Sequence, residues 1–265
     1  MHELKNSVFH ELICFANRYG INKKGDGATV RLSDVSFLQK GKGKDLLFLH
    51  GYMSSKEAFT PQIEYFSKFY RVTAIDFLGF GKSRGLETPF SVGDYAAWLN
   101  EVTFLLRLRK PSVVAHSFGC RVAIKAAAQD NALFDKLILT GAAGVILRRG
   151  LRYKLKVGAY RWVKKVAPAF AERKFGSAEY RTLSPLMKES YKKIVNEDLR
   201  SCAARVKNPV LIIQGKQDVV TPLQEAQAYL ASFPSATLRM IEGGHFAFVE
   251  RPLAFNLITE EFLYE

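Results

Sequence analysis

A chain of 265 residues, 48% of them hydrophobic, is long enough for one large domain with a full core, and this composition excludes a disordered or fibrous protein. The formal charge of +14 is unusual, and 17 Lys and Arg against five Asp and Glu place +12 of it between residues 145 and 207. No nucleic-acid-binding motif accompanies this charge, so we expect no nucleic-acid partner. A solvated helical surface is the simplest interpretation. An anionic substrate or a weak contact with an acidic membrane are the alternatives, because clustered charge attracts opposite charge.

The N-terminal residues do not resemble a secretory signal, since neither a basic leader nor a small-residue cleavage site frames their apolar run. Apolar residues there recur at the spacing of one face of a short amphipathic helix: Leu4, Val8, Leu12 and Tyr19. No uninterrupted apolar stretch approaches the roughly 20 residues that a membrane span needs. The cysteines are scattered and odd in number: Cys14, Cys120 and Cys202. This usage is typical of reduced thiols, so we expect a cytoplasmic protein without a metal cluster.

From residue 29 onward the pattern predicts alternating strands and helices. Residues 29–38 read as two short strands with a turn at Ser33–Asp34, and the apolar run 46–50 is typical of a strand buried on both faces. Further strands are predicted at 72–76, 113–116, 136–140, 210–214 and 237–241. Helices are predicted at 58–69, 92–108, 118–128, 222–230 and at the C-terminus. Such alternation indicates an α/β fold with a parallel sheet covered on both faces.

The alternation breaks between residues 145 and 207, which are basic, helical in composition and without a convincing strand. We therefore predict one core made of residues 1–144 and 208–265. Residues 145–207 form a helical cap inserted between the sixth and seventh strands. Nothing in the sequence indicates an oligomeric state.

The strongest chemical signal is the segment Val113–Gly119, where a strand ends, a serine follows and a helix begins. A serine on so tight a turn projects its hydroxyl out of the sheet, and the turn requires small residues two positions before and after it. Ala115 and Gly119 meet that requirement around Ser117. The new helix also directs N–H groups and its positive dipole end toward a developing oxyanion. We therefore predict that Ser117 is a nucleophile.

Two backbone N–H groups are predicted to hold that oxyanion. Gly51, just after a central strand, lets the chain bend so that the N–H of Tyr52 points into the site, and the second donor is the N–H of Phe118. We interpret His50 as a structural hydrogen-bonding residue. His116, beside the serine, is expected to point to the opposite side of the turn.

A serine nucleophile needs a general base, and the imidazole of that base needs a carboxylate to fix its tautomer. His245 follows the predicted strand 237–241, and Asp218 ends the segment Gln214–Asp218. The segment Thr140–Gly144, after the preceding strand, contains no competing carboxylate. Ser117, Asp218 and His245 are therefore the predicted catalytic residues, in the order Ser, Asp, His, each on a loop after the carboxyl end of a strand.

Taken together, these motifs resemble the α/β-hydrolase superfamily, in its capped, cofactor-free branch, from about residue 28 to the C-terminus. The matching segments are LFLHGY at 47–52, DFLGFGKS at 76–83, AHSFG at 115–119, QGKQD at 214–218 and GGHFAFVERP at 243–252. The resemblance implies an eight-stranded, mostly parallel sheet with a helical lid, and it makes Asp76 a structural residue. Branches with Asp at the nucleophile position, the haloalkane dehalogenases and epoxide hydrolases, are disfavoured.

Three functions remain open from the sequence. The leading one is a serine esterase, or a hydrolase of a related thioester, amide or carbon–carbon bond next to a carbonyl, acting on a small acyl substrate that is anionic or apolar. The second is a cofactor-free lyase, because Ser117–Arg121 (SFGCR) resembles the SMGGR of the menaquinone-pathway synthase and makes Arg121 a candidate anion ligand. The third is a sensor that keeps the triad and binds a small ligand.

Overall fold

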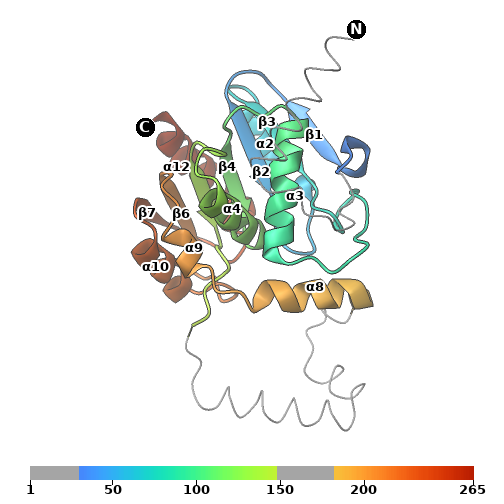
Figure 1. The fold of residues 1–265 in the computed structure, drawn as a ribbon. Coiled ribbons are helices and arrows are strands. Elements are labelled where there is room, and N and C mark those ends of the chain that lie inside the picture. The colour runs from blue at the N-terminus through green and yellow to red at the C-terminus, as the bar shows by residue number, and fades with distance from the viewer. Residues whose placement is uncertain (1–29, 148–181) are drawn as a thin grey trace. The chain divides into compact units, whose positions relative to one another are not determined.

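The computed structural model describes residues 30–147 and 182–265 (Figure 1). The chain divides into two units, residues 1–30 and 31–265, and the second contains every helix and strand described. The predicted N-terminal helix and residues 148–181 of the predicted cap lie outside the described residues.

The second unit is built on a seven-stranded sheet in the order β1-β3-β2-β4-β5-β6-β7. The strands are β1 (Phe37–Lys40), β2 (Asp45–Leu49), β3 (Arg71–Ile75), β4 (Ser112–His116), β5 (Leu137–Thr140), β6 (Val210–Gly215) and β7 (Ala236–Ile241). Only the β1–β3 pair is antiparallel. The predicted mostly parallel sheet is therefore confirmed. Because parallel strands end at one edge, the loops after β2, β4, β6 and β7 meet there.

One predicted strand is wrong: the described residues form seven strands rather than eight. The first strand of the pair expected in 29–38 is replaced by the 3₁₀-helix η1 (Leu32–Asp34). The N–H of Asp34 donates to the carbonyl of Arg31 at 2.9 Å, and the two side chains form an i,i+3 ion pair at 3.2 Å. These local bonds close a turn and leave β1 to begin only at Phe37.

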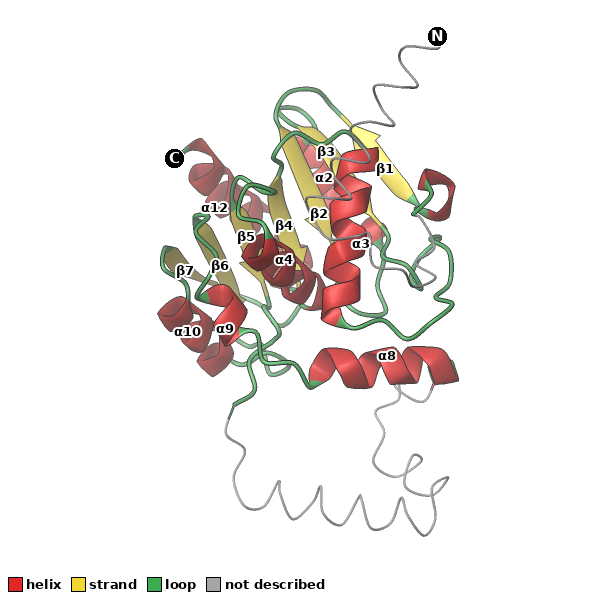
Figure 2. Cartoon of the chain, in the orientation of Figure 1, coloured by secondary structure: helices red, strands yellow, loops and turns green. Residues whose placement is uncertain are grey.

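Helices cover both faces of the sheet, as Figure 2 shows. The helices α3 (Val92–Leu105) and α4 (Phe118–Gln129) pack together on one face, beside α9 (Arg200–Ala203) and α10 (Leu223–Ser232). The helices α2 (Thr60–Phe66) and α12 (Pro252–Tyr264) lie on the other, with the short η2 (Lys56–Phe59) and α11 (Ala247–Glu250). Among the described helices, none is both long and apolar enough to cross a membrane.

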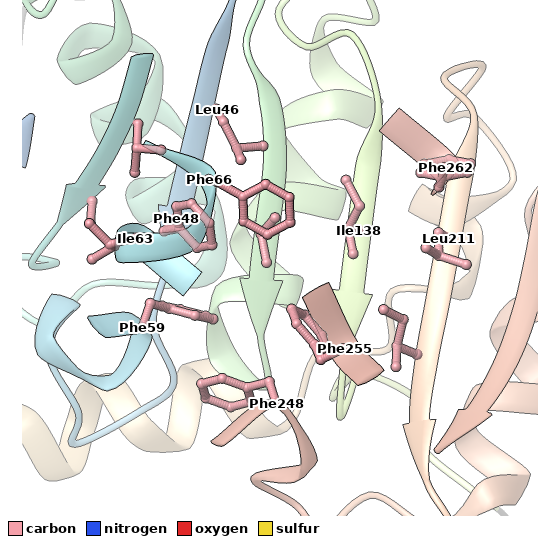
Figure 3. Close-up of a cluster of buried hydrophobic side chains, with 14 of the residues drawn as sticks. Leu46, Phe48, Phe59, Ile63, Phe66, Ile138, Leu211, Phe248, Phe255 and Phe262 are labelled. Atoms are coloured by element: carbon pink, nitrogen blue, oxygen red, sulfur yellow. The ribbon is translucent and has the colours of Figure 1, made fainter. Parts of the chain in front are cut away.

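The apolar core explains why the central strands read as continuous hydrophobic runs. Every residue of β2, β4, β5 and β6 is buried, whereas the edge strand β1 is exposed. On the α2–α12 face, aromatic rings from distant segments interlock over the strands: Phe48, Phe59, Phe66, Phe248 and Phe255 (Figure 3). The rings of Phe59 and Phe248 lie 4.7 Å apart, which ties the loop after β2 to the C-terminal helices.

The helix α8 (Pro185–Val195) crosses the carboxyl edge of the sheet (Figure 1). Its N-cap is Ser184, whose hydroxyl accepts a hydrogen bond from the N–H of Met187. The hydroxyl of Tyr52 donates to the carbonyl of Met187 at 3.2 Å, and Ser190 accepts from the N–H of Phe90 at 2.8 Å. Thus α8 lies over the loops after β2 and β3.

Candidate active site

Ser117 occupies a strained turn between β4 and α4. Its φ of 49° is in the left-handed region that side chains other than glycine rarely adopt, and its N–H donates to the carbonyl of Thr140 at 3.1 Å. A Cβ on Gly119 would lie 2.4 Å from the carbonyl oxygen of Leu49, closer than any real contact. The chain therefore needs glycine two residues after the serine, for the steric reason expected from the sequence.

The loop after β2 passes directly beside this turn. A Cβ on Gly51 would lie 3.6 Å from the Cβ of Ser117, and the rings of Tyr52 and Phe118 are in edge contact with centroids 5.6 Å apart. Phe118 is the first residue of α4, so its N–H has no acceptor within the helix. The two residues predicted as oxyanion donors thus come together next to Ser117.

Asp218 and His245 are hydrogen-bonded at the same edge. The Nδ1 of His245 lies 2.9 Å from Oδ2 of Asp218, which also accepts the hydroxyl of Thr221 at 2.7 Å. The other oxygen, Oδ1, accepts the N–H groups of Val220 and Thr221 at 2.8 and 2.9 Å. Although burial alone would raise the pKa of Asp218, the hydrogen bonds from His245 and Thr221 lower it to about 2. The carboxylate is charged at neutral pH, so it keeps the proton of His245 on Nδ1.

His245 lies over the ends of β4 and β5. A Cβ on Gly141 would lie 3.0 Å from Nδ1 and Cε1 of His245, and the rings of His116 and His245 are 4.7 Å apart. The predicted serine, acid and histidine are therefore at one edge. The structure records the bond between Asp218 and His245 but, within the described residues, none between the Ser117 hydroxyl and the imidazole. Such bonds are often long in unliganded enzymes and tighten when substrate binds.

His50 and Asp76 have structural surroundings. Nδ1 of His50 is 2.7 Å from the carbonyl of Gly51, and Nε2 accepts the N–H of Phe77 at 3.0 Å. Burial lowers the pKa of His50, which keeps it neutral. Asp76 accepts both the N–H and the ammonium of Lys56 at 2.7 Å. Burial opposes its charge, but the hydrogen bonds from Lys56 lower the pKa of Asp76 below its ordinary value. Both residues therefore hold loops in place.

Arg121 is hydrogen-bonded to backbone carbonyls around the end of α8. Its side chain is buried, and Nη1 donates to the carbonyls of Ile194 at 2.9 Å and Glu197 at 3.0 Å. Ile194 lies in the last turn of α8 and Glu197 just beyond its end, where cations are favourable because a helix C-terminus carries partial negative charge. Arg121 therefore anchors α8 to α4, and its role as an anion ligand stays a prediction.

Sequence reasoning missed two residues of the site. His116 does not point away from it: its Nε2 donates to the carbonyl of His245 at 3.0 Å. Burial lowers the pKa of His116 to about 3, so the ring is neutral. Thr221 orients the Asp218 carboxylate, and its Oγ1 lies 3.2 Å from Nδ1 of His245. For His116 the available signal is its position directly before Ser117, and for Thr221 it is only the hydroxyl just before Pro222, where a helix is predicted to begin.

In the described part of the chain, His, Cys, Asp and Glu side chains do not gather into a group of three that could hold a metal ion. The described cysteines, Cys120 and Cys202, are free and buried. Cys120 contacts the carbonyl of Ala115 at 3.1 Å, and burial raises the pKa of its thiol well above the ordinary range.

A mostly parallel sheet with a strained serine after β4 and an Asp–His pair after β6 and β7 defines an α/β-hydrolase-type protein. The model of the alpha/beta hydrolase family matches residues 46–256. The chain belongs to that family.

Known proteins agree with this assignment. An uncharacterised protein of Mycobacterium tuberculosis, Rv2715, is 28% identical over 264 residues, covering 86% of this chain and 77% of its own. A 2-hydroxy-6-oxo-6-(2'-aminophenyl)hexa-2,4-dienoic acid hydrolase of Metapseudomonas resinovorans is 24% identical, covering 87% of each chain. Among solved structures, an esterase from Exiguobacterium antarcticum superimposes with a TM-score of 0.70 at 23% identity, covering 87% of this chain and 96% of that one. A structural likeness at 23% sequence identity shows that the fold is shared and nothing further.

Proposed function

We propose that this chain is a serine hydrolase that cleaves a carboxylic ester, or a related acyl bond, through an acyl-enzyme on Ser117. The observation that carries the proposal is the 2.9 Å bond between Asp218 and His245 at the edge where Ser117 is held in its strained turn. An esterase and a dienoic acid hydrolase among the similar proteins support the same reaction class.

In the first half of the reaction, Nε2 of His245 removes the hydroxyl proton of Ser117, and the alkoxide attacks the substrate carbonyl. Asp218 keeps the other imidazole proton on Nδ1 and stabilises the imidazolium that forms. The N–H groups of Tyr52 and Phe118 hold the oxyanion, and each such donor contributes about 3 kcal/mol to the transition state. His245 then protonates the leaving group.

In the second half, His245 activates a water that hydrolyses the acyl-enzyme, and Ser117 recovers its proton. The cap is proposed to cover this site through α8, which is among its described residues. The ring of Tyr52 packs against that of Tyr191 on α8 at 5.2 Å and against Phe80 at 4.8 Å. An aromatic cluster thus joins the loop after β2, which carries Tyr52, to α8. We expect the site beside this cluster to favour short to medium acyl groups.

A fluorophosphonate probe tests the nucleophile directly. We expect the probe to label the wild-type chain and the control Ser54→Ala, whose serine lies two residues after Tyr52, but not Ser117→Ala. Labelling that persists in a folded Ser117→Ala variant would refute the assignment. A series of p-nitrophenyl esters of graded chain length, with acyl-CoA thioesters in parallel and Ser117→Ala as the blank, then defines the acyl group.

The lyase alternative depended on Arg121 as an anion ligand. Because Nη1 of Arg121 donates to the carbonyls of Ile194 and Glu197, at and just beyond the end of α8, no observation in the described chain favours that alternative. A ligand-binding sensor would show very slow turnover together with ligand-dependent binding of a partner. The ester series separates it from a hydrolase.

A further inference from the structure

A cavity of about 730 Å³ lies at the opposite edge of the sheet from Ser117. Asp45, Arg71 and Ser112, the first residues of β2, β3 and β4, form its floor. The loop 41–44 and the turn 107–110 form its rim. Strand β4 runs from Ser112 in this cavity to His116 beside the nucleophile, so the two places are separated by roughly 13 Å of strand.

Charge distinguishes this cavity. Six of its lining residues are cationic: Lys42, Lys44, Arg71, Arg107, Arg109 and Lys110. Two are acidic, and both are engaged. Asp45 accepts Nε and Nη2 of Arg71 at 2.5 and 2.8 Å and the N–H of Arg109 at 2.7 Å. Asp135 lies 3.5 Å from the ammonium of Lys110.

Four cations are left without compensation. The side chains of Lys42, Lys44, Arg107 and Arg109 are exposed, and none of them forms an ion pair with another described residue. All four belong to the part of the chain outside the basic segment 145–207. Like charges gathered at one concave site repel one another, so they favour an anion that binds between them.

The backbone that carries these cations is constrained. Arg107 and Lys110 have φ angles of 52° and 47°, in the left-handed region where glycine costs least. The carbonyl of Arg107 also accepts Nη2 of Arg71 at 2.9 Å. On the facing rim, a Cβ on Gly41 would lie 2.2 Å from the carbonyl oxygen of Ser67, so the Lys42–Lys44 loop begins where the backbone passes too close to residue 67 for any side chain. The backbone positions from which the cations extend are thus constrained at the cavity rim.

We propose that this cavity is a binding site for a phosphate-bearing anion with several negative charges. Arginine and lysine are the residues that recognise phosphate oxygens, and the volume is within the range of small-molecule sites. The phosphates belong either to a soluble ligand or to a lipid headgroup. The site is separate from the acyl-transfer site, so it does not depend on the proposed hydrolase activity.

Calorimetric titration with inorganic tripolyphosphate tests the soluble source. We expect binding that weakens as salt is added, and at least ten-fold weaker binding in the double variant Lys42→Gln/Lys44→Gln. The matched control Lys82→Gln/Arg239→Gln removes two exposed charges from outside the cavity and should leave the affinity unchanged. Equal affinity in the two double variants would overturn the site.

Arg107→Gly distinguishes binding from folding. It relieves the left-handed strain, so the melting temperature should rise while the affinity for tripolyphosphate falls. Flotation with phosphatidylcholine vesicles that contain or lack phosphatidylinositol bisphosphate tests the lipid source. Binding to the phosphorylated vesicles that is lost in Lys42→Gln/Lys44→Gln supports the lipid headgroup. Binding to neither tripolyphosphate nor vesicles refutes the proposal.

Discussion

The substitution Asp218→Asn isolates the electrostatic role of the carboxylate while keeping its shape. In the variant, the amide oxygen must face the N–H groups of Val220 and Thr221, because only an oxygen can accept them. The amide nitrogen then faces Nδ1 of His245 and donates to it. The imidazole proton is therefore forced onto Nε2, which can no longer take the proton of Ser117.

The expected loss of kcat is about 10⁴-fold, the effect of the wrong histidine tautomer in a serine–histidine–aspartate triad, and it corresponds to about 5 kcal/mol. KM should change little, because Asp218 is buried and contacts His245 and Thr221 rather than solvent. A variant that keeps a rate within about ten-fold of the wild-type rate would refute the proposed role of Asp218.

The same substitution has a pH-dependent effect on stability. The pKa of Asp218 falls from 3.8 to about 2 on folding, so the charged carboxylate stabilises the native state by about 2 kcal/mol at neutral pH. Because the folded pKa is the lower one, this contribution is complete above pH 3.8 and is lost as the pH falls toward 2. Asp218→Asn should be less stable than the wild type at neutral pH, and the difference should shrink in acid.

Urea unfolding at several pH values and steady-state hydrolysis of the best p-nitrophenyl ester measure the two effects. The matched control is Glu242→Gln, which removes a carboxylate from the loop just before His245. Glu242 is exposed and accepts from Lys216 and Gln217. We expect the control to keep its activity. Equal losses in both variants would mean that net charge at this edge, and not the tautomer of His245, controls the rate.

Three further substitutions test separate features. Ser117→Gly should raise the free energy of unfolding by about 1 kcal/mol while abolishing hydrolysis, because it relieves a φ of 49°; a thermal scan without a rise in Tm would contradict the strain. His116 is buried, and its pKa is lowered from 6.5 to about 3 in the folded chain. As the pH falls, the unfolded chain therefore takes up a proton before the folded chain does, and below pH 6.5 the free energy of unfolding decreases by about 1.4 kcal/mol per pH unit. His116→Gln should flatten that slope in urea unfolding. Gly119→Val should prevent folding, because its Cβ would lie 2.4 Å from the carbonyl of Leu49, whereas Gly85→Ala, with open space around it, should give a normal circular dichroism spectrum.

The edge of the sheet at which the site forms could be predicted from the sequence, because strand alternation is a local pattern. Ser117, Asp218 and His245 each follow an apolar run, and parallel strands bring such positions to one edge whatever the sequence distance. The strained turn was also predictable, because the small residues on either side of Ser117 mark it locally, although the carbonyl that excludes a side chain at Gly119 comes from Leu49 on β2.

Long-range partners could not be predicted. The residues around Arg121 in the sequence do not indicate that its guanidinium donates to a carbonyl at the end of α8. Whether it binds an anion or helix carbonyls depends on how α4 and α8 pack together. The cavity at the amino edge was missed for the same reason: its cations come from loops around 42, 71 and 107 that only the strand order brings together. The first strand expected in 29–38 failed for a local reason, because the residues around Leu32–Asp34 form a 3₁₀ turn despite their alternating pattern.

Strands β5 and β6 pair along Leu137–Thr140 and Val210–Ile213 although residues 141–209 separate them in the chain. Residues 141–209 are therefore an insertion between two strands that pair directly with each other. In the course of evolution such an insertion can be lengthened, shortened or replaced while the hydrogen bonds between β5 and β6 are kept. Selection for a new substrate could thus act on one contiguous stretch of the gene and leave the reacting groups as they are.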